Sequence, residues 1–409
     1  MSVAGIIFTF TAMLIAALAV EPLARRLNLP FSAMLVAAGF TGSELLTRNH
    51  FDLGLRWYHF HDLVLFVLLP VLIFESAFNM RLRVLLANLV AVLILAIPLM
   101  LLSAAVSAVA IYYGINHPTG FPWIAALLAG ALLAATDPVA VIDLGRRFGL
   151  PERLVILIEG ESLFNDATAI VLFGVLLAIA TMEGPAPEPV AALADFTSVF
   201  LGGLLVGIAV GVLAWLVFRL TRDEIARGVT SLVAAYSSVL MAEVYLHVSS
   251  VMAVLATGLL LGATSRRGGE NGQFLGMLWR LNAWIANAAI FLLAGITITT
   301  DMFTSQWLAI GIGIVAVLMA RAVGIFGVLP LLRWLPGVQP VEPAWQRVMF
   351  WGGLRGAVVL ALALSLPTEL PYWYTIQAIA YGVVVFTLFV QAPTMPLLLR
   401  RIGVPGNDR

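Results

Sequence analysis

Apolar runs long enough to cross a bilayer follow one another along nearly the whole chain. A membrane-spanning helix needs about 20 mostly apolar residues. Helices are the expected structure because a span in lipid must bond every backbone N–H and C=O within itself. The runs therefore predict an all-α polytopic membrane protein with 13 transmembrane helices. The predicted spans are residues 3–22, 30–46, 62–79, 84–113, 122–144, 154–181, 196–218, 228–246, 249–264, 281–299, 306–332, 345–366 and 373–398.

The composition excludes most other classes of protein. Charged residues are 11% of the 409 and hydrophobic residues 62%, whereas a soluble domain carries about 25% charged residues. The 22 basic and 22 acidic residues cancel, and without a basic run nucleic acid is not an expected partner. The chain has no cysteine, which excludes disulfides and thiolate metal sites. It also lacks a Walker-type phosphate loop, and we expect neither a cofactor nor an enzymatic activity.

The arginines predict how the spans are oriented. Residues 3–20 look like a signal peptide, but no positive charge precedes them and two arginines follow, which favours a retained helix with its N-terminus outside. In this arrangement 18 of the 22 arginines fall in inside loops, Arg48 and Arg56 lie outside, and Arg321 and Arg355 lie within spans. The bias predicts a cytoplasmic C-terminus, and we expect the protein in a bacterial inner (plasma) membrane.

Thirteen spans also allow two inverted halves. Helices 1–6 and 8–13 would form six-helix repeats of opposite orientation joined by helix 7, a common plan among transporters. The fifth helix of each half carries residues that interrupt helices, namely Thr136-Asp137-Pro138 in helix 5 and the glycine-rich segment 352–356 in helix 12. Breaks at matching positions predict that a binding site lies where helices 5 and 12 meet.

The first of these breaks supplies oxygen ligands. Pro138 has no N–H, so the carbonyl of Ala134 loses its helical partner. Freed carbonyls, with Thr136 nearest the break, can replace water around a small cation, and Asp137 can cap the positive end of the following half-helix. A charge at membrane depth costs several kcal/mol unless it is paired or hydrated. The alternative is a proline kink with an acid near the membrane surface.

A second polar motif, residues 160–166, lies in helix 6. At 100° per residue Glu161 and Asn165 share one stripe of that helix, and Ser162 and Asp166 share the adjacent one. A hydroxyl and a carboxylate on one face are hard oxygen ligands, which suit Na⁺ or Li⁺ better than a transition metal. The alternative is a polar stripe that bonds helices together.

The intramembrane arginines need partners because arginine does not lose its proton. We expect Arg321 to pair with Glu161 and hold helix 6 against helix 11. Arg355 would offset the carbonyl end of broken helix 12, with Glu75 a further acid in reach. Glu75 has two other interpretations. It could support the ion site, or it could reach the inner membrane surface, where two arginines follow it.

These motifs resemble those of a known family. Thr136-Asp137-Pro138, residues 160–166, Phe74-Glu75-Ser76 and residues 352–356 look like the motifs of NhaP/NHE-type sodium/proton antiporters, the cation:proton antiporter-1 group. The resemblance runs through essentially the whole chain, which it implies to be a single membrane antiporter domain over residues 1–409.

The resemblance implies a homodimer in a lipid bilayer. Residues 1–80 and 190–303 would form the dimerisation scaffold, and residues 81–189 and 304–401 the ion-transporting core. Many family members carry a long cytosolic regulatory tail. The sequence stops about ten residues after its last predicted helix, so we expect no regulation through such a tail.

The resemblance also implies roles for the polar residues. It assigns the cation to Asp166, Asp137, Ser162 and the backbone of Thr136. By the same likeness Asn165 supports Asp137, Glu161 pairs with Arg321, and Glu75 lies near the site. Arg355 is a further supporting residue because its intramembrane charge must be neutralised. Family members with asparagine before the key aspartate are typically electroneutral, and Asn165 is in that position.

The expected activity is electroneutral exchange of Na⁺, or Li⁺, for H⁺ by alternating access. A carboxyl group in a partly desolvated pocket retains a proton more readily than one in water. Asp166 would then bind a proton or a sodium ion, one at a time. The alternatives are a K⁺/H⁺ antiporter of the same fold, a cation channel with acidic pore residues, and an intramembrane hydrolase that uses Asp137 and Asp166 as a dyad.

Overall fold

The structure, a computed structural model, is helical throughout the part of the chain that it describes, where it contains no strand. The all-α class predicted from the sequence is therefore confirmed. The described residues are 3–27, 29–48, 63–115, 121–182, 188–221, 223–265, 270–334 and 339–402.

The elements follow one another with short connections, and several spans consist of consecutive pieces. In order they are α1 (Val3–Leu27), α2 (Phe31–Arg48), η1 (Leu63–Leu68), α4 (Leu69–Asn79), α5 (Leu82–Ala87), α6 (Leu89–Ala96), α7 (Pro98–Gly114), α8 (Trp123–Ala134), α9 (Val139–Phe148), α10 (Glu152–Thr181), α11 (Pro189–Leu220), α12 (Glu224–Val239), η2 (Leu240–Tyr245), α13 (Ser250–Ser265), α14 (Glu270–Thr297), α15 (Thr300–Ser305), α16 (Trp307–Ala322), η4 (Val323–Val328), η5 (Leu329–Trp334), α17 (Pro343–Trp351), α18 (Ala357–Leu364), α19 (Trp373–Phe386), η6 (Thr387–Gln391) and α20 (Ala392–Ile402).

Every predicted span coincides with one of these helices or with two or three consecutive pieces. Within the described ranges, nine helices are long and apolar enough to cross a membrane. Three shorter apolar helices cover Phe31–Leu45, Leu63–Asn79 and Ser250–Ser265. The remaining predicted span, residues 345–366, is divided between α17 and α18. That thirteen segments cross a membrane stays a prediction.

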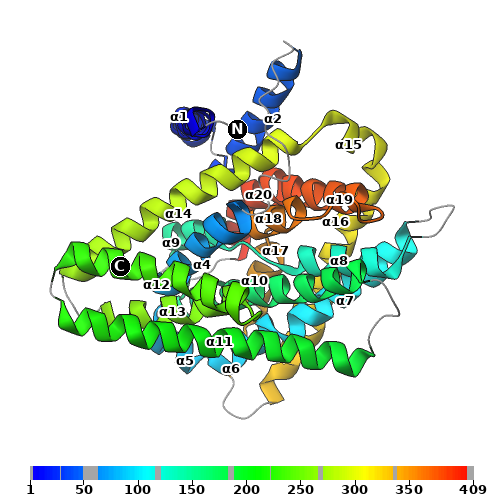
Figure 1. Cartoon of the computed structure of the whole chain (residues 1–409). Coiled ribbons are helices and arrows are strands. Elements are labelled where there is room, and N and C mark those ends of the chain that lie inside the picture. The colour runs from blue at the N-terminus through cyan, green and yellow to red at the C-terminus, as the bar shows by residue number, and fades with distance from the viewer. Residues whose placement is uncertain are drawn as a thin grey trace.

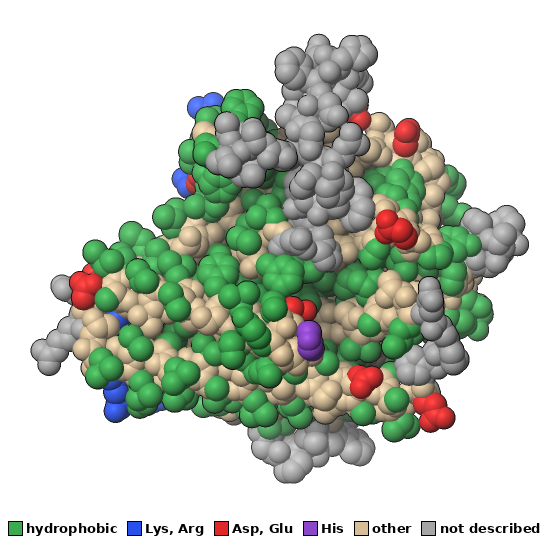
Figure 2. Space-filling view, viewed as in Figure 1, with side chains coloured by type: hydrophobic (Ala, Val, Ile, Leu, Met, Phe, Trp, Pro, Cys, Tyr) green, Lys and Arg blue, Asp and Glu red, His purple; other side chains and the backbone are tan. Residues whose placement is uncertain are grey.

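The outside of the bundle is apolar along the sides of the helices. Many of the long helices, α11 and α14 among them, run from left to right in Figure 1. Hydrophobic side chains cover much of this face in Figure 2, with arginines at the left and most of the acidic side chains towards the right. Large apolar residues on α1 point outwards, and Phe8 is 71% exposed. Charged groups near the helix ends and apolar flanks between them are what a bilayer requires.

Helices α11 and α13 pack so closely that their contact needs glycine. A Cβ atom on Gly207 would lie 2.1 Å from the carbonyl oxygen of Ala253, and one on Gly203 would lie 2.2 Å from that of Ser249. Small residues at such positions let two backbones approach each other, as is common between membrane helices.

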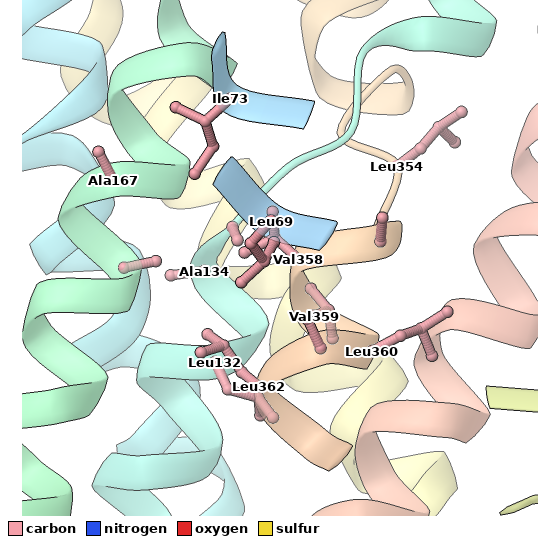
Figure 3. Packing of buried hydrophobic residues seen from close by; sticks show 14 of the residues in the cluster. Leu69, Ile73, Leu132, Ala134, Ala167, Leu354, Val358, Val359, Leu360 and Leu362 are labelled. Carbon is pink, nitrogen blue, oxygen red and sulfur yellow. The ribbon is translucent and has the colours of Figure 1, made fainter. Parts of the chain in front are cut away.

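Both helices that were predicted to be broken are interrupted. The helix ends at Ala134 in α8 and resumes at Val139 in α9. Likewise α17 ends at Trp351, and α18 begins at Ala357. Figure 3 shows the coil beyond Ala134 passing close to the coil that leads into Val358. The N–H of Asp137 donates to the carbonyl oxygen of Leu354 at 2.8 Å, so the two unwound segments cross in direct contact.

Candidate cation site

The first unwound segment exposes carbonyl groups that side chains from elsewhere satisfy. The Ala134 oxygen accepts from Asn165 Nδ2 at 3.1 Å and from Arg355 Nη1 at 3.0 Å. The Ala135 oxygen accepts from Arg355 Nη1 at 2.7 Å. The Thr136 oxygen accepts from the hydroxyl of Ser162. Buried carbonyls without a partner are unfavourable, so these donors stabilise the break that Pro138 imposes.

Asp137 lies where the two unwound segments meet. Its Oδ1 accepts from the N–H of Val139 at 3.0 Å, so the predicted capping of the following half-helix is confirmed. Its carboxylate also lies flat against the backbone of Gly356, where a Cβ atom would be 1.9 Å from Oδ2. A glycine is therefore required at position 356 for Asp137 to keep this place.

The two polar stripes of helix α10 face two different cavities. Ser162 and Asp166 line a large cavity of about 920 Å³. Glu161 and Asn165 line a much smaller one. The two stripes predicted from the helical period, about 100° apart on one helix, therefore face different cavities.

The large cavity has an acidic lining. Its walls come from α4, α9, α10, α14, α18 and the two unwound segments, and two of its lining residues, Arg81 and Arg280, are exposed. Four carboxylates and two guanidinium groups line it, those of Glu75, Asp137, Glu159, Asp166, Arg81 and Arg280. An excess of acids in a cleft with apolar walls attracts cations.

Asp166 has the chemistry of a cation ligand. Its Oδ1 is buried and has no hydrogen-bond partner among the described residues. A buried carboxylate oxygen needs a proton or a cation to offset its desolvation. Asp137, Ser162 and the Thr136 segment line the same cavity and supply oxygen atoms, as Na⁺ prefers. Within the described ranges, His, Cys, Asp and Glu side chains form no group of three or more that could hold a resident metal ion.

Glu161 and Arg321 form the expected ion pair. The carboxylate of Glu161 accepts from Arg321 Nη1, and its second oxygen from Nη2 at 3.2 Å. Both side chains are buried, at 3% and 10% exposure. Arg321 also donates to the carbonyl oxygen of Met349, from Nε at 3.2 Å and Nη2 at 2.9 Å. It thereby connects α16 to α10 and to the end of α17.

The expectation for Arg355 is wrong. It was predicted to offset the carbonyl end of its own broken helix, but its guanidinium donates to Ala134 and Ala135, at the carbonyl end of α8. Arg321 bonds the end of α17 instead. The physical reason is the crossing of the two segments, because it brings Arg355 beside carbonyls that Pro138 has already freed. Glu75 lines the large cavity and accepts from Asn79 at 2.6 Å.

The sequence did not predict a role for two parts of the site. Gly356 belongs to a recognisable glycine-rich motif, but the need for it at that position becomes apparent only when Asp137 lies against it. Helix α14 provides one wall of the cavity, including Trp284 and Asn287. No acid or proline marks this stretch of α14, so the sequence held no clear signal for it.

Comparison with known proteins identifies the family. Residues 10–401 match the family described as "Sodium/hydrogen exchanger, transmembrane". The chain belongs to the sodium/hydrogen exchanger family. It is 37% identical over 352 residues to the Na⁺/H⁺ antiporter ApNhaP of Aphanothece halophytica, and 34% identical over 355 residues to the low-affinity Na⁺/H⁺ antiporter NhaS1 of a Synechocystis strain. Each alignment covers 85% of this chain and 66% of the relative.

A solved structure has the same fold as this chain. The sodium proton antiporter MjNhaP1 from Methanocaldococcus jannaschii matches with a TM-score of 0.78 at 19% identity, over 97% of this chain and 98% of that one. At this identity the match supports the fold alone. Family membership and the apolar helices together show that the chain is an integral membrane protein.

The buried ion pair yields a stability prediction. Arg321→Met should lower the free energy of unfolding by about 3–5 kcal/mol, because it leaves the Glu161 carboxylate buried without its partner. Glu161→Gln with Arg321→Met should restore part of the loss, since the unpaired charge is gone. Thermal unfolding in detergent, followed by size-exclusion chromatography, measures both. Equal losses in the single and double variants would contradict the pairing.

The position of Asp137 yields a second prediction. Gly356→Ala should slow cation exchange by about 100-fold, because the new methyl group displaces the Asp137 carboxylate and a misplaced group loses that order of rate. Gly174→Ala is the matched control, since a Cβ atom at Gly174 on α10 meets nothing within 4 Å. Initial rates in proteoliposomes measure the difference. If both variants transport at similar rates, the close packing of Asp137 on position 356 does not matter.

Proposed function

We propose that this exchanger catalyses one-for-one exchange of Na⁺, or Li⁺, for H⁺ across the membrane by alternating access, with both ions competing for Asp166. The observation that carries the proposal is the buried Oδ1 of Asp166, which has no hydrogen-bond partner among the described residues and lies in an acidic cavity beside the crossing of two broken helices. The names of ApNhaP and NhaS1 support the same activity.

Competition follows from the environment of the carboxylate. Because the described part of the chain offers its buried Oδ1 no partner, the ionised group is unfavourable until a cation or a proton neutralises it. Both ions would occupy the same oxygen, so binding of one excludes the other. If the core changes its exposure only when Asp166 is neutralised, sodium moving one way is matched by a proton moving the other way.

The neighbours of Asp166 favour a stoichiometry of one to one. Asn165 carries no charge, and its Nδ2 is occupied by the Ala134 oxygen and by Thr136 Oγ1 at 3.3 Å. Asp137 accepts from the N–H of Val139 at the start of α9, and a helix N-terminus stabilises its ionised form. One acid then exchanges its proton, and each cycle moves equal charge in both directions.

The larger arrangement is also part of the proposal. The core would consist of residues 81–189 and 304–401, and it would move against a scaffold of residues 1–80 and 190–303 that forms the homodimer. The crossing of α8–α9 with α17–α18 supports two inverted six-helix repeats joined by α11, the seventh span. The arginines visible in Figure 2 lie towards its left side, and this one-sided distribution supports an outside N-terminus and a cytoplasmic C-terminus.

Substitution of the shared carboxylate tests the proposal. Asp166→Asn should abolish Na⁺-dependent proton flux in proteoliposomes while the protein stays folded and monodisperse, because an amide cannot exchange a proton for sodium. Asp195→Asn, an exposed acid on α11, is the control and should transport normally. Substantial Na⁺-dependent flux in Asp166→Asn would refute the assignment. Flux driven by K⁺ but not by Na⁺ or Li⁺ in the wild type would favour the potassium alternative.

A clamped membrane potential tests the stoichiometry. With a potassium gradient and an ionophore setting the voltage, wild-type rates of sodium-driven proton flux should stay nearly unchanged, because no net charge moves. Marked acceleration by one polarity would mean more than one proton per sodium. Ion flux without an obligatory counter-ion would indicate a channel.

A further inference from the structure

A second cavity lies behind the proposed cation site, on the other polar face of α10. It has a volume of about 10 Å³. Among the described residues none lines both cavities, so the unwound segment and α10 separate them. This volume is about the least that a single water molecule needs.

Two polar atoms on the wall of this cavity lack partners in the described part of the protein. They are Asn165 Oδ1, which can accept a hydrogen bond, and Arg355 Nε, which can donate one. Both side chains are 2% exposed. Buried groups of this kind are rarely left unpaired, because each loses its hydrogen bonds to water on folding.

The orientation of the Asn165 amide is fixed by its other partners. Nδ2 donates to the Ala134 oxygen at 3.1 Å and lies 3.3 Å from Thr136 Oγ1. Turning the amide over would place its oxygen against the Ala134 oxygen, and two acceptors repel each other. The unpaired atom of Asn165 is therefore its oxygen.

The two unpaired atoms belong to groups that lie side by side. The Ala134 oxygen accepts from Asn165 Nδ2 and also from Arg355 Nη1 at 3.0 Å. The amide and the guanidinium therefore converge on one oxygen atom, and both line the small cavity. One small molecule in the cavity can reach both groups.

The chemistry of the two atoms identifies that molecule. It must accept a hydrogen bond from an N–H and donate one to an amide oxygen. A metal cation cannot accept from Nε and is repelled by the guanidinium, and a chloride ion cannot donate to Oδ1. We propose that one ordered water molecule occupies the cavity, accepts from Arg355 Nε and donates to Asn165 Oδ1.

This water would act as a positioning element for the cation site. It joins α10 to the segment that carries Arg355, and it adds a further contact to the Asn165 amide, whose Nδ2 holds Thr136. Thr136 lines the cation cavity directly. Expelling the water leaves Oδ1 and Nε unpaired, and the Thr136 segment loses part of its support. The transport consequence rests on the proposed function, but the presence of the water does not.

The first test is direct observation of the water. A cryo-EM map of the full chain in nanodiscs, at a resolution that shows other buried waters, should contain density within hydrogen-bond distance of Asn165 Oδ1 and Arg355 Nε. Direct contact between these two atoms, or an empty cavity, overturns the inference. If the wild-type protein shows this density but does not exchange sodium for protons in proteoliposomes, the proposed function is refuted and this inference stands.

A pair of substitutions tests the role of the water. Ser103 lines the small cavity but not the large one. Ser103→Val fills the cavity with methyl groups, and Ser103→Ala leaves it open. The valine variant should lose the density and raise the KM for Na⁺ about tenfold, the cost of one lost buried hydrogen bond. The alanine variant should retain both the density and the wild-type KM.

Two outcomes would overturn the positioning role. One is an equal KM in the two variants, and the other is loss of the density in Ser103→Val with an unchanged KM. If the valine variant does not fold, Ser103→Thr adds one methyl group, keeps the hydroxyl and carries the same expectation.

Discussion

The crossing of two unwound segments is the interaction on which the rest of the site depends. An unwound backbone inside a membrane is tolerated only where its polar groups find partners. Here each segment supplies partners for the other, because Asp137 donates to Leu354 while Arg355 donates to Ala134 and Ala135. Neither break would be satisfied alone, so the position of the candidate ligands depends on both helices at once.

The charged groups that stay paired and the carboxylate proposed to change its charge lie on different faces of α10. Behind α10, Glu161 is paired with Arg321, and Arg355 is bonded to helix carbonyls. These charges are engaged in buried contacts and hold the helices together. In front of α10, Asp166 has an oxygen that none of the described residues contacts by a hydrogen bond. In the proposed mechanism the charge therefore changes on one face of α10, while the charged groups on the other face stay paired and hold the helices together.

Much of this arrangement was predictable from the sequence, and the exceptions have a common cause. Hydropathy located the helices, Pro138 and the glycine-rich motif located the breaks, and the helical period separated the two faces of α10, because all of these are local patterns. The partner of Arg355 was predicted incorrectly, since it belongs to a distant helix that the crossing brings near. The wall formed by α14 and the packing of Gly356 likewise exist only in three dimensions.

The distribution of polar contacts favours a core that moves as one body. The contacts that define the site, from the Glu161 pair to the Asp137–Leu354 bond, join residues of the proposed core segments to one another. Helices α4 and α14 of the proposed scaffold face these residues across the large cavity. At the far end of α14, Thr297 and Tyr381 are 2.8 Å apart and join α14 to α19. Exposing Asp166 to the opposite side would therefore require breaking that contact, while the crossing itself would stay intact.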